Sequence, residues 1–194
     1  MKKLLNVGGN SKAIPLPKQY ENFEHLLLDI DPKGNPDVLC DARELSSLEH
    51  NQFDMIYCSH NLEHYYRHDV VKVLQGFLDV LKPGGGIHII VPNIMAVVKT
   101  MVEKELDIDD VLYQSALGPI LISDVLYGYG KQIEESGVDF FAHKTGFTHK
   151  SLLRALVKIG FKNIHSSETG YNLTAVGFKN EASPELANLF NIHI

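Results

Sequence analysis

The chain has 194 residues, of which 44% are hydrophobic and 22% are charged, and it carries a formal net charge of −6. This is the composition of an ordinary globular protein with one domain, or one domain with an insertion. The acidic balance argues against a general binder of nucleic acid or of anionic membranes.

Cysteine usage and apolar patterning indicate a protein of the cytoplasm. Cys40 and Cys58 each end an apolar run, and we expect buried free thiols in a reducing compartment. The N-terminus has too few apolar residues for a signal peptide. The longest apolar stretch, 87–98, contains a proline and is too short to span a bilayer. We therefore expect a soluble, cytoplasmic protein.

Short runs that are apolar throughout recur in the first half of the chain and predict strands buried on both faces of a parallel sheet. They lie at residues 3–7, 25–30, 37–40, 53–58 and 87–91.

Helical spacing of apolar residues follows the fourth and fifth of these runs. It predicts a helix over 62–81 with Gly84 as its C-cap, a second helix over 94–102, and a third between Thr148 and Gly160. Two final strands, at 161–167 and 172–178, flank a turn and are suited to a hairpin. We therefore expect a Rossmann-like, doubly wound α/β fold, with a mostly parallel seven-stranded sheet and an antiparallel C-terminal hairpin.

Sheets of this kind bind ligands at the carboxyl ends of their strands, so the loops there are the candidate site. The first strand ends in Gly8 and Gly9, which either form a simple tight turn or let the backbone approach a ligand. The full dinucleotide fingerprint is absent, because Asn10 follows and two prolines stand where a phosphate-binding helix is expected.

Two aspartates end the next two strands. Asp29, about twenty residues after the glycines, is suited to accept from both ribose hydroxyls of either NAD or S-adenosylmethionine. Asp41 is placed to accept from an adenine amino group, although a surface aspartate that begins a helix explains it equally well.

The segment "SHNLEH" after the fourth strand matches the inverted zinc-protease pattern H-x-x-E-H. A third ligand could come from His88, His143 or His149. However, His60 falls at the junction between strand and helix, so His60 and His64 need not face the same way. We therefore expect no metal here, and a helix that forms without one.

The segment "FDMIYCSHNLEHYYRHDVVKVLQGFLDVLKPGGGIHIIVPN" resembles class I S-adenosylmethionine-dependent methyltransferases. More narrowly, the motifs SH-x-LEH and LKPGG resemble a bacterial group of small predicted methyltransferases, and the resemblance extends over residues 3–178. It implies that the glycines lie beneath the methionine part of the cofactor, with Asp29 on the ribose and Ser59 and His60 near the methyl group. Asn10 departs from the family, which usually has a second glycine there. The implied cofactor-binding residues are Gly8, Gly9, Asn10, Asp29, Ile30, Asp41, Ala42, Ser59 and His60.

The stretch 106–147 is longer than the fold needs, and its aromatic residues favour a cap over the substrate; the alternative is a helical excursion packed on the sheet. We expect a methyltransferase domain at 1–180, with this cap inserted in it, and a C-terminal tail at 181–194.

The expected function is methyl transfer to a small-molecule or sugar-type acceptor, with no nucleic-acid or membrane partner. If the acceptor must lose a proton, His60 is the first candidate base and His143 the second. The alternatives are a non-catalytic subunit that keeps the fold, and an NAD-dependent oxidoreductase. Neither the acceptor atom nor the oligomeric state follows from the residues.

Overall fold

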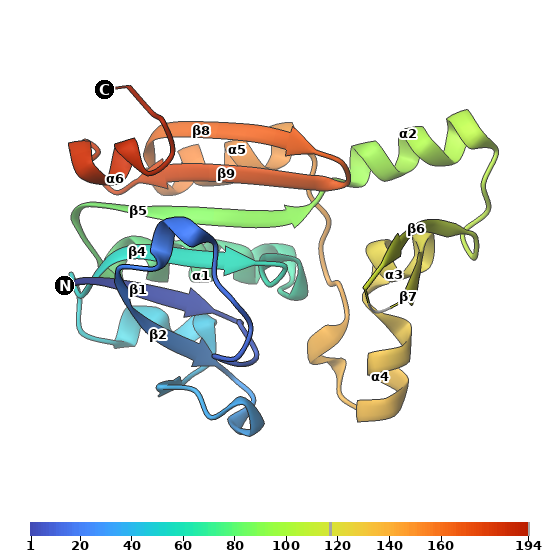
Figure 1. Ribbon diagram of the computed structural model, residues 1–194, viewed down its shortest axis with the longest axis horizontal. Coiled ribbons are helices and arrows are strands. Elements are labelled where there is room, and N and C mark those ends of the chain that lie inside the picture. The colour runs from blue at the N-terminus through green and yellow to red at the C-terminus, as the bar shows by residue number, and fades with distance from the viewer. Residues whose placement is uncertain (117, 194) are drawn as a thin grey trace.

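A seven-stranded sheet in the order β3-β2-β1-β4-β5-β9-β8 forms the centre of the computed structural model, which describes residues 1–116 and 118–193 (Figure 1). The first five strands in this order pair in parallel, whereas β9 runs antiparallel to both β5 and β8. This confirms the predicted mostly parallel sheet with its C-terminal hairpin. The strands are β1 (Lys2–Val7), β2 (Phe23–Asp29), β3 (Val38–Leu39), β4 (Phe53–Ser59), β5 (Leu81–Pro92), β8 (Lys162–Thr169) and β9 (Asn172–Phe178).

One face of the sheet is covered by the 3-10 helix η3 (Ala42–Ser47) and by the helices α1 (Arg67–Val80) and α5 (His149–Ile159). Side chains of neighbouring strands, such as Leu5 and Ile56, share a core with Phe77 of α1 and Leu156 of α5, and all four are fully buried. Each such side chain contributes about 1.5–3 kcal/mol relative to an exposed one.

The opposite face has a different cover. The connection from residue 8 to 22 contains only the 3-10 helix η1 (Lys18–Tyr20) and no α-helix. Instead, Tyr20 packs there together with Leu186 of the short C-terminal helix α6 (Pro184–Asn188), against Leu4 and Met55 of the sheet. The predicted tail therefore contributes to the core.

Several predicted helix boundaries are confirmed and two are wrong. Thr148 caps α5 through the N–H of Ser151, and Gly160 ends it with a φ of +116°. The first helix, in contrast, begins at Arg67, because residues 62–64 form the separate 3-10 helix η4 (Leu62–His64). Gly84 is not its C-cap, since the helix ends at Val80 and the chain continues directly into β5.

The predicted insertion lies beyond the carboxyl ends of the parallel strands, as Figure 1 shows. It follows α2 (Ile94–Lys104) and has a small core of its own, in which Val97 of α2 contacts Leu112, Ile122 and Val125. Its elements are the antiparallel pair β6 (Val111–Ser115) and β7 (Gly118–Leu121), the helices α3 (Ile122–Tyr127) and α4 (Gly130–Ser136), and the 3-10 helix η5 (Asp139–Phe141).

Neither cysteine of the chain forms a disulfide; Cys58 is buried and Cys40 half-buried. Within residues 1–116 and 118–193, no helix has the length and apolarity that crossing a bilayer requires.

Candidate cofactor and acceptor cavity

A cavity of about 410 Å³ lies between the carboxyl ends of β1, β2 and β4 and the insertion. Its volume falls within the range of roughly 300–1,000 Å³ that small-molecule and cofactor sites occupy. The lining residues come from both halves of the structure: Gly8, Asp29, Ile30, Asp31, Asp41, Arg43, His60, Asn61, His64, Tyr65, Tyr66, Asp69, Asp139, Phe140, Phe141 and Lys144.

The glycine loop after β1 is tightly packed. Gly8 has a φ of +69°, and its N–H donates to the carbonyl of Leu28 at 2.8 Å. A Cβ at Gly8 would lie 2.0 Å from the Nδ2 of Asn61. The glycine therefore lets the loop after β4 approach the loop after β1, and both loops border the cavity.

Asp29 is 9% exposed at the end of β2, and its carboxylate organises the loops around it. Oδ2 accepts the N–H of Asn10 at 2.9 Å, and Oδ1 accepts the N–H of Asp31 at 2.9 Å. Each carboxylate oxygen has a second lone pair. Asp29 can therefore hold the glycine loop and still accept from a ligand hydroxyl.

Asp41 lines the cavity, but Arg43 already engages its carboxylate. Nε of Arg43 donates to both oxygens, at 3.1 and 3.0 Å, and one terminal nitrogen donates to Oδ2 at 2.6 Å. Partial burial opposes ionisation of Asp41, but the hydrogen bonds from Arg43 outweigh it and hold the pKa of Asp41 below its ordinary value. An adenine amino group would have to share this carboxylate with the guanidinium.

The "SHNLEH" segment forms a strained loop rather than the first turn of a helix. His60 has a φ of +50°, in the left-handed region that few non-glycine residues adopt, and its N–H donates to the carbonyl of Ile90 at 2.8 Å. The conformation places the half-exposed side chain of His60 in the cavity lining. Tyr65, which follows η4, also lines the cavity, and burial raises the pKa of its phenol.

The insertion is joined to this loop by backbone and side-chain hydrogen bonds. The N–H groups of Lys144 and Thr145 both donate to the carbonyl of Glu63, at 2.8 and 3.1 Å. Nδ1 of His64 donates to the carbonyl of Ala142 at 3.1 Å. These bonds hold Phe140, Phe141 and Lys144 over the strand ends.

Of the predicted site residues, five line the cavity: Gly8, Asp29, Ile30, Asp41 and His60. Gly9, Asn10, Ala42 and Ser59 lie beside the lining without forming it, and His143 sits behind His64 with a ring-centroid distance of 5.0 Å. The residues that the sequence did not predict are mainly charged or aromatic ones, such as Arg43, Tyr66 and Asp69. No local pattern distinguishes them from ordinary surface residues.

Comparison with known proteins agrees with this architecture. Residues 11–89, from the loop after β1 into β5, match the family model described as a methyltransferase domain. No curated protein matches the sequence.

Solved structures match over nearly the whole chain. An S-adenosylmethionine-dependent methyltransferase from Archaeoglobus fulgidus superposes with a TM-score of 0.58 at 16% identity, covering 91% of this chain and 86% of that one. Another from Mesorhizobium loti gives 0.56 at 17% identity, covering 91% and 90%. A chain from a Haloferax volcanii complex, between the Trm112 methyltransferase activator and a methyltransferase, gives 0.59 at 13% identity, covering 92% and 83%.

The chain has the class I methyltransferase fold. In this fold the cavity described above lies where strand order reverses, between β1 and β4, as the general rule for ligand sites in open α/β sheets requires.

Proposed function

We propose that this protein transfers a methyl group from S-adenosylmethionine to a small-molecule or sugar-type acceptor. One observation carries the proposal. The same cavity is lined by Gly8 and Asp29 at the strand ends and by aromatic and charged residues of the insertion. A cofactor and an acceptor can therefore meet in it, with the insertion serving as the cap.

The charge of the lining favours this cofactor over NAD. Five of the lining residues are aspartates, whereas only two, Arg43 and Lys144, are an arginine or a lysine. An acidic lining suits a cationic sulfonium and repels a pyrophosphate. A pyrophosphate would also lack its usual helix N-terminus, because the connection from 8 to 22 contains no α-helix.

Gly8 and Asp29 would hold S-adenosylmethionine at the methionine and ribose parts, with Ile30 and Asp41 bordering the adenine. When bound, the cofactor would supply an electrophilic methyl group, which passes to the acceptor atom as its bond to sulfur breaks and the neutral thioether leaves. The protein has to align that acceptor and exclude water. Phe140 and Phe141 of the insertion lie over the cavity and can do both.

The acceptor end of the cavity combines aromatic faces with charged groups. Lys144 Nζ lies 3.2 Å from a carboxylate oxygen of Asp139 and 5.7 Å from the centre of the Tyr66 ring. Carboxylates accept hydrogen bonds from hydroxyl groups, and aromatic rings cover apolar ring faces, so the lining suits a polyhydroxylated ring such as a sugar.

His60 is the proposed general base for an acceptor that must lose a proton. It lines the cavity, and its Nδ1 lies 3.4 Å from Oε1 of Glu63. His143 is less suited to this role because it lies outside the lining and its Nδ1 donates to the carbonyl of Val125 at 2.9 Å.

Calorimetry with S-adenosylmethionine, its demethylated product and NAD tests the cofactor assignment. We expect the first two to bind and NAD not to bind. Transfer of a labelled methyl group to a pool of sugars and other small hydroxylated acceptors then tests the reaction. Binding of NAD alone would overturn the assignment.

A non-catalytic, cofactor-binding partner subunit is the second candidate. The observation that favours it is Asn10, which has a positive φ of +59° and places a side chain where the methyltransferases that the sequence resembles usually have a second glycine. For such a subunit, calorimetry would detect the cofactor while no acceptor in the pool became labelled.

A further inference from the structure

Glu63 is a buried carboxylate without hydrogen-bond partners. It is 1% exposed, and within the described part of the chain neither of its side-chain oxygens has a hydrogen bond. Leaving an ionised carboxylate buried and unpaired costs several kcal/mol. A cation bound beside the carboxylate would offset this cost; within the described residues, Nδ1 of His60 lies 3.4 Å from Oε1, on a half-exposed side chain.

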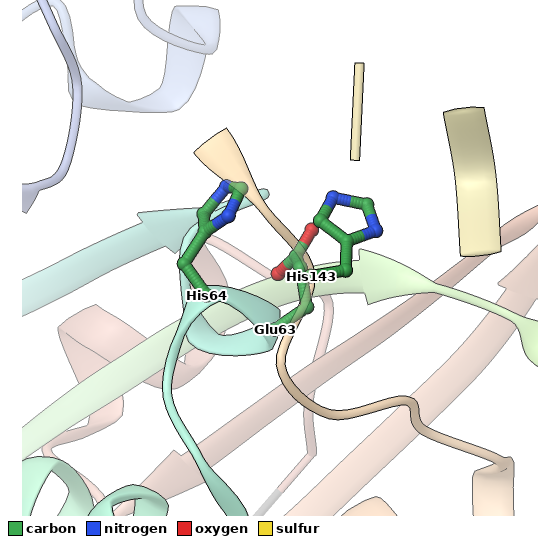
Figure 2. Close-up of side chains that lie close together, drawn as sticks. All are labelled: Glu63, His64 and His143. Atoms are coloured by element: carbon green, nitrogen blue, oxygen red, sulfur yellow. The ribbon is translucent and has the colours of Figure 1, made fainter. Parts of the chain in front are cut away.

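Two further imidazoles converge on the same carboxylate. Figure 2 shows Glu63 and His64, which come from the loop after β4, together with His143, which enters from the insertion. One potential ligand atom from each of the three residues lies within 4.8 Å of the others. Ligand atoms around a tetrahedral zinc ion are roughly 3.4 Å apart, so small side-chain rotations would bring the three to coordination distance.

Both histidines have a backbone carbonyl as hydrogen-bond partner at Nδ1. Nδ1 of His64 donates to the carbonyl of Ala142, and Nδ1 of His143 to that of Val125. A carbonyl can only accept, so Nδ1 carries the proton and Nε2 of the neutral ring keeps its lone pair. Metal-bound histidines in proteins almost always have such a second-shell partner.

We propose that Glu63, His64 and His143 bind a divalent first-row transition-metal ion, with zinc as the reference ion. Two histidines and one glutamate form a known zinc ligand set that leaves a coordination position open. His64 lines the cavity, so that position can take water or an oxygen of a small ligand. The ion would neutralise the buried carboxylate and join the insertion to the loop after β4.

This site differs from the zinc-protease pattern that the sequence suggested. In that pattern His60 and His64 would be the paired ligands, whereas the structure pairs His64 with His143 and leaves His60 half-exposed beside Glu63. Helix α1 needs no metal, because its apolar face is buried against the sheet. The proposed site thus departs from the expectation of no metal at the loop, and the experiment below tests which of the two is right.

Metal binding to the full chain, stripped with a chelator and studied without S-adenosylmethionine, tests the proposal. Calorimetry with zinc and elemental analysis should find one ion per chain. The variants Glu63→Gln, His64→Ala and His143→Ala should each weaken zinc binding by more than about 100-fold, because loss of a second-shell partner alone costs roughly 10–100-fold. His68→Ala is the matched control, since the His68 side chain is 75% exposed on α1.

Two results would overturn the proposal: no zinc bound by the wild-type chain, or binding that survives all three ligand variants. Circular dichroism of each variant distinguishes loss of a ligand from loss of the fold, and His143→Gln replaces His143→Ala if the latter unfolds. The second result would include the case in which only His60→Ala abolishes binding, which would make His60 a ligand in place of the three residues. Because no step uses the cofactor, failure here leaves the proposed methyl transfer untouched.

Discussion

The backbone N–H of Asn10 donates to Oδ2 of Asp29 at 2.9 Å, so one carboxylate links the glycine loop after β1 to the end of β2. The other oxygen accepts the N–H of Asp31. Asp29 therefore shapes the loop and also faces the cavity, and its removal affects both.

Replacing Asp29 with alanine should weaken binding of S-adenosylmethionine by about 30–150-fold, which corresponds to about 2–3 kcal/mol for a charge-assisted contact. Calorimetry measures this directly, with the exposed Asp109→Ala as the matched control. Asn10→Gly keeps both the donor and the positive φ, so it should change the affinity by less than about threefold. Unchanged affinity in Asp29→Ala would remove Asp29 from the cofactor site.

The substitution Gly8→Ala should destabilise the protein more than Gly170→Ala. Both glycines have positive φ, +69° and +56°, but a Cβ at Gly8 meets the side chain of Asn61 and a Cβ at Gly170 meets nothing within 4 Å. Gly170→Ala should cost about 1–2 kcal/mol, the backbone term alone. Gly8→Ala should cost clearly more and also weaken cofactor binding. Urea unfolding measures the stability of both variants. Equal decreases in the free energy of unfolding would show that the close contact between the two loops does not contribute to stability.

Substitution of His60 by glutamine tests the proposed base. Turnover should fall by about 10²–10⁴, while the affinity for S-adenosylmethionine stays unchanged. His68→Gln, on the exposed side of α1, should keep full turnover. If cofactor binding falls along with turnover in His60→Gln, the residue shapes the loop after β4 and the assignment as a base is wrong.

The buried His88 should make stability depend on pH. Burial lowers its pKa from 6.5 to about 4, and its Nδ1 is 2.9 Å from the hydroxyl of Tyr20. Between these two values the unfolded chain binds a proton that the folded chain does not, so stability falls as pH falls from about 6.5 towards 4. The full loss is about 3 kcal/mol.

Urea unfolding at several pH values checks this window. The double variant Tyr20→Phe with His88→Phe removes the titrating group and leaves no orphaned hydroxyl, so its stability should vary less with pH between 6.5 and 4. His68→Gln, which removes an exposed histidine, should keep the slope of the wild type. A double variant with an unchanged slope would mean that another group is responsible.

Local pattern predicted much of the fold because the relevant signals are short-ranged. Strands buried on both faces are apolar throughout, which located β1, β2 and β4 to within two residues, and the turn between the last two strands located β9. Thr148 and Gly160 marked α5 because capping depends on neighbouring residues. The prediction of Gly84 as a C-cap was wrong for the same reason. A glycine after an apolar helix resembles a C-cap, but the chain pairs with β4 and forms β5 from Leu81 onward.

The strand ends and the loops after them, with Gly8, Asp29, Asp41 and His60, could be named from the sequence alone, because the ends of parallel strands meet at one edge of a sheet. What those residues face was decided by the tertiary structure. Arg43 covers Asp41, and the insertion brings Phe141 and Lys144 over the strand ends.

The same holds for the group of Glu63, His64 and His143. From the sequence, Glu63 and His64 are adjacent, and His143 was one of three histidines considered as a third ligand. Only the folding of the insertion over the loop after β4 placed His143, and not His88 or His149, beside the buried carboxylate. Contacts between residues far apart in the chain depend on packing, and no local spacing encodes them.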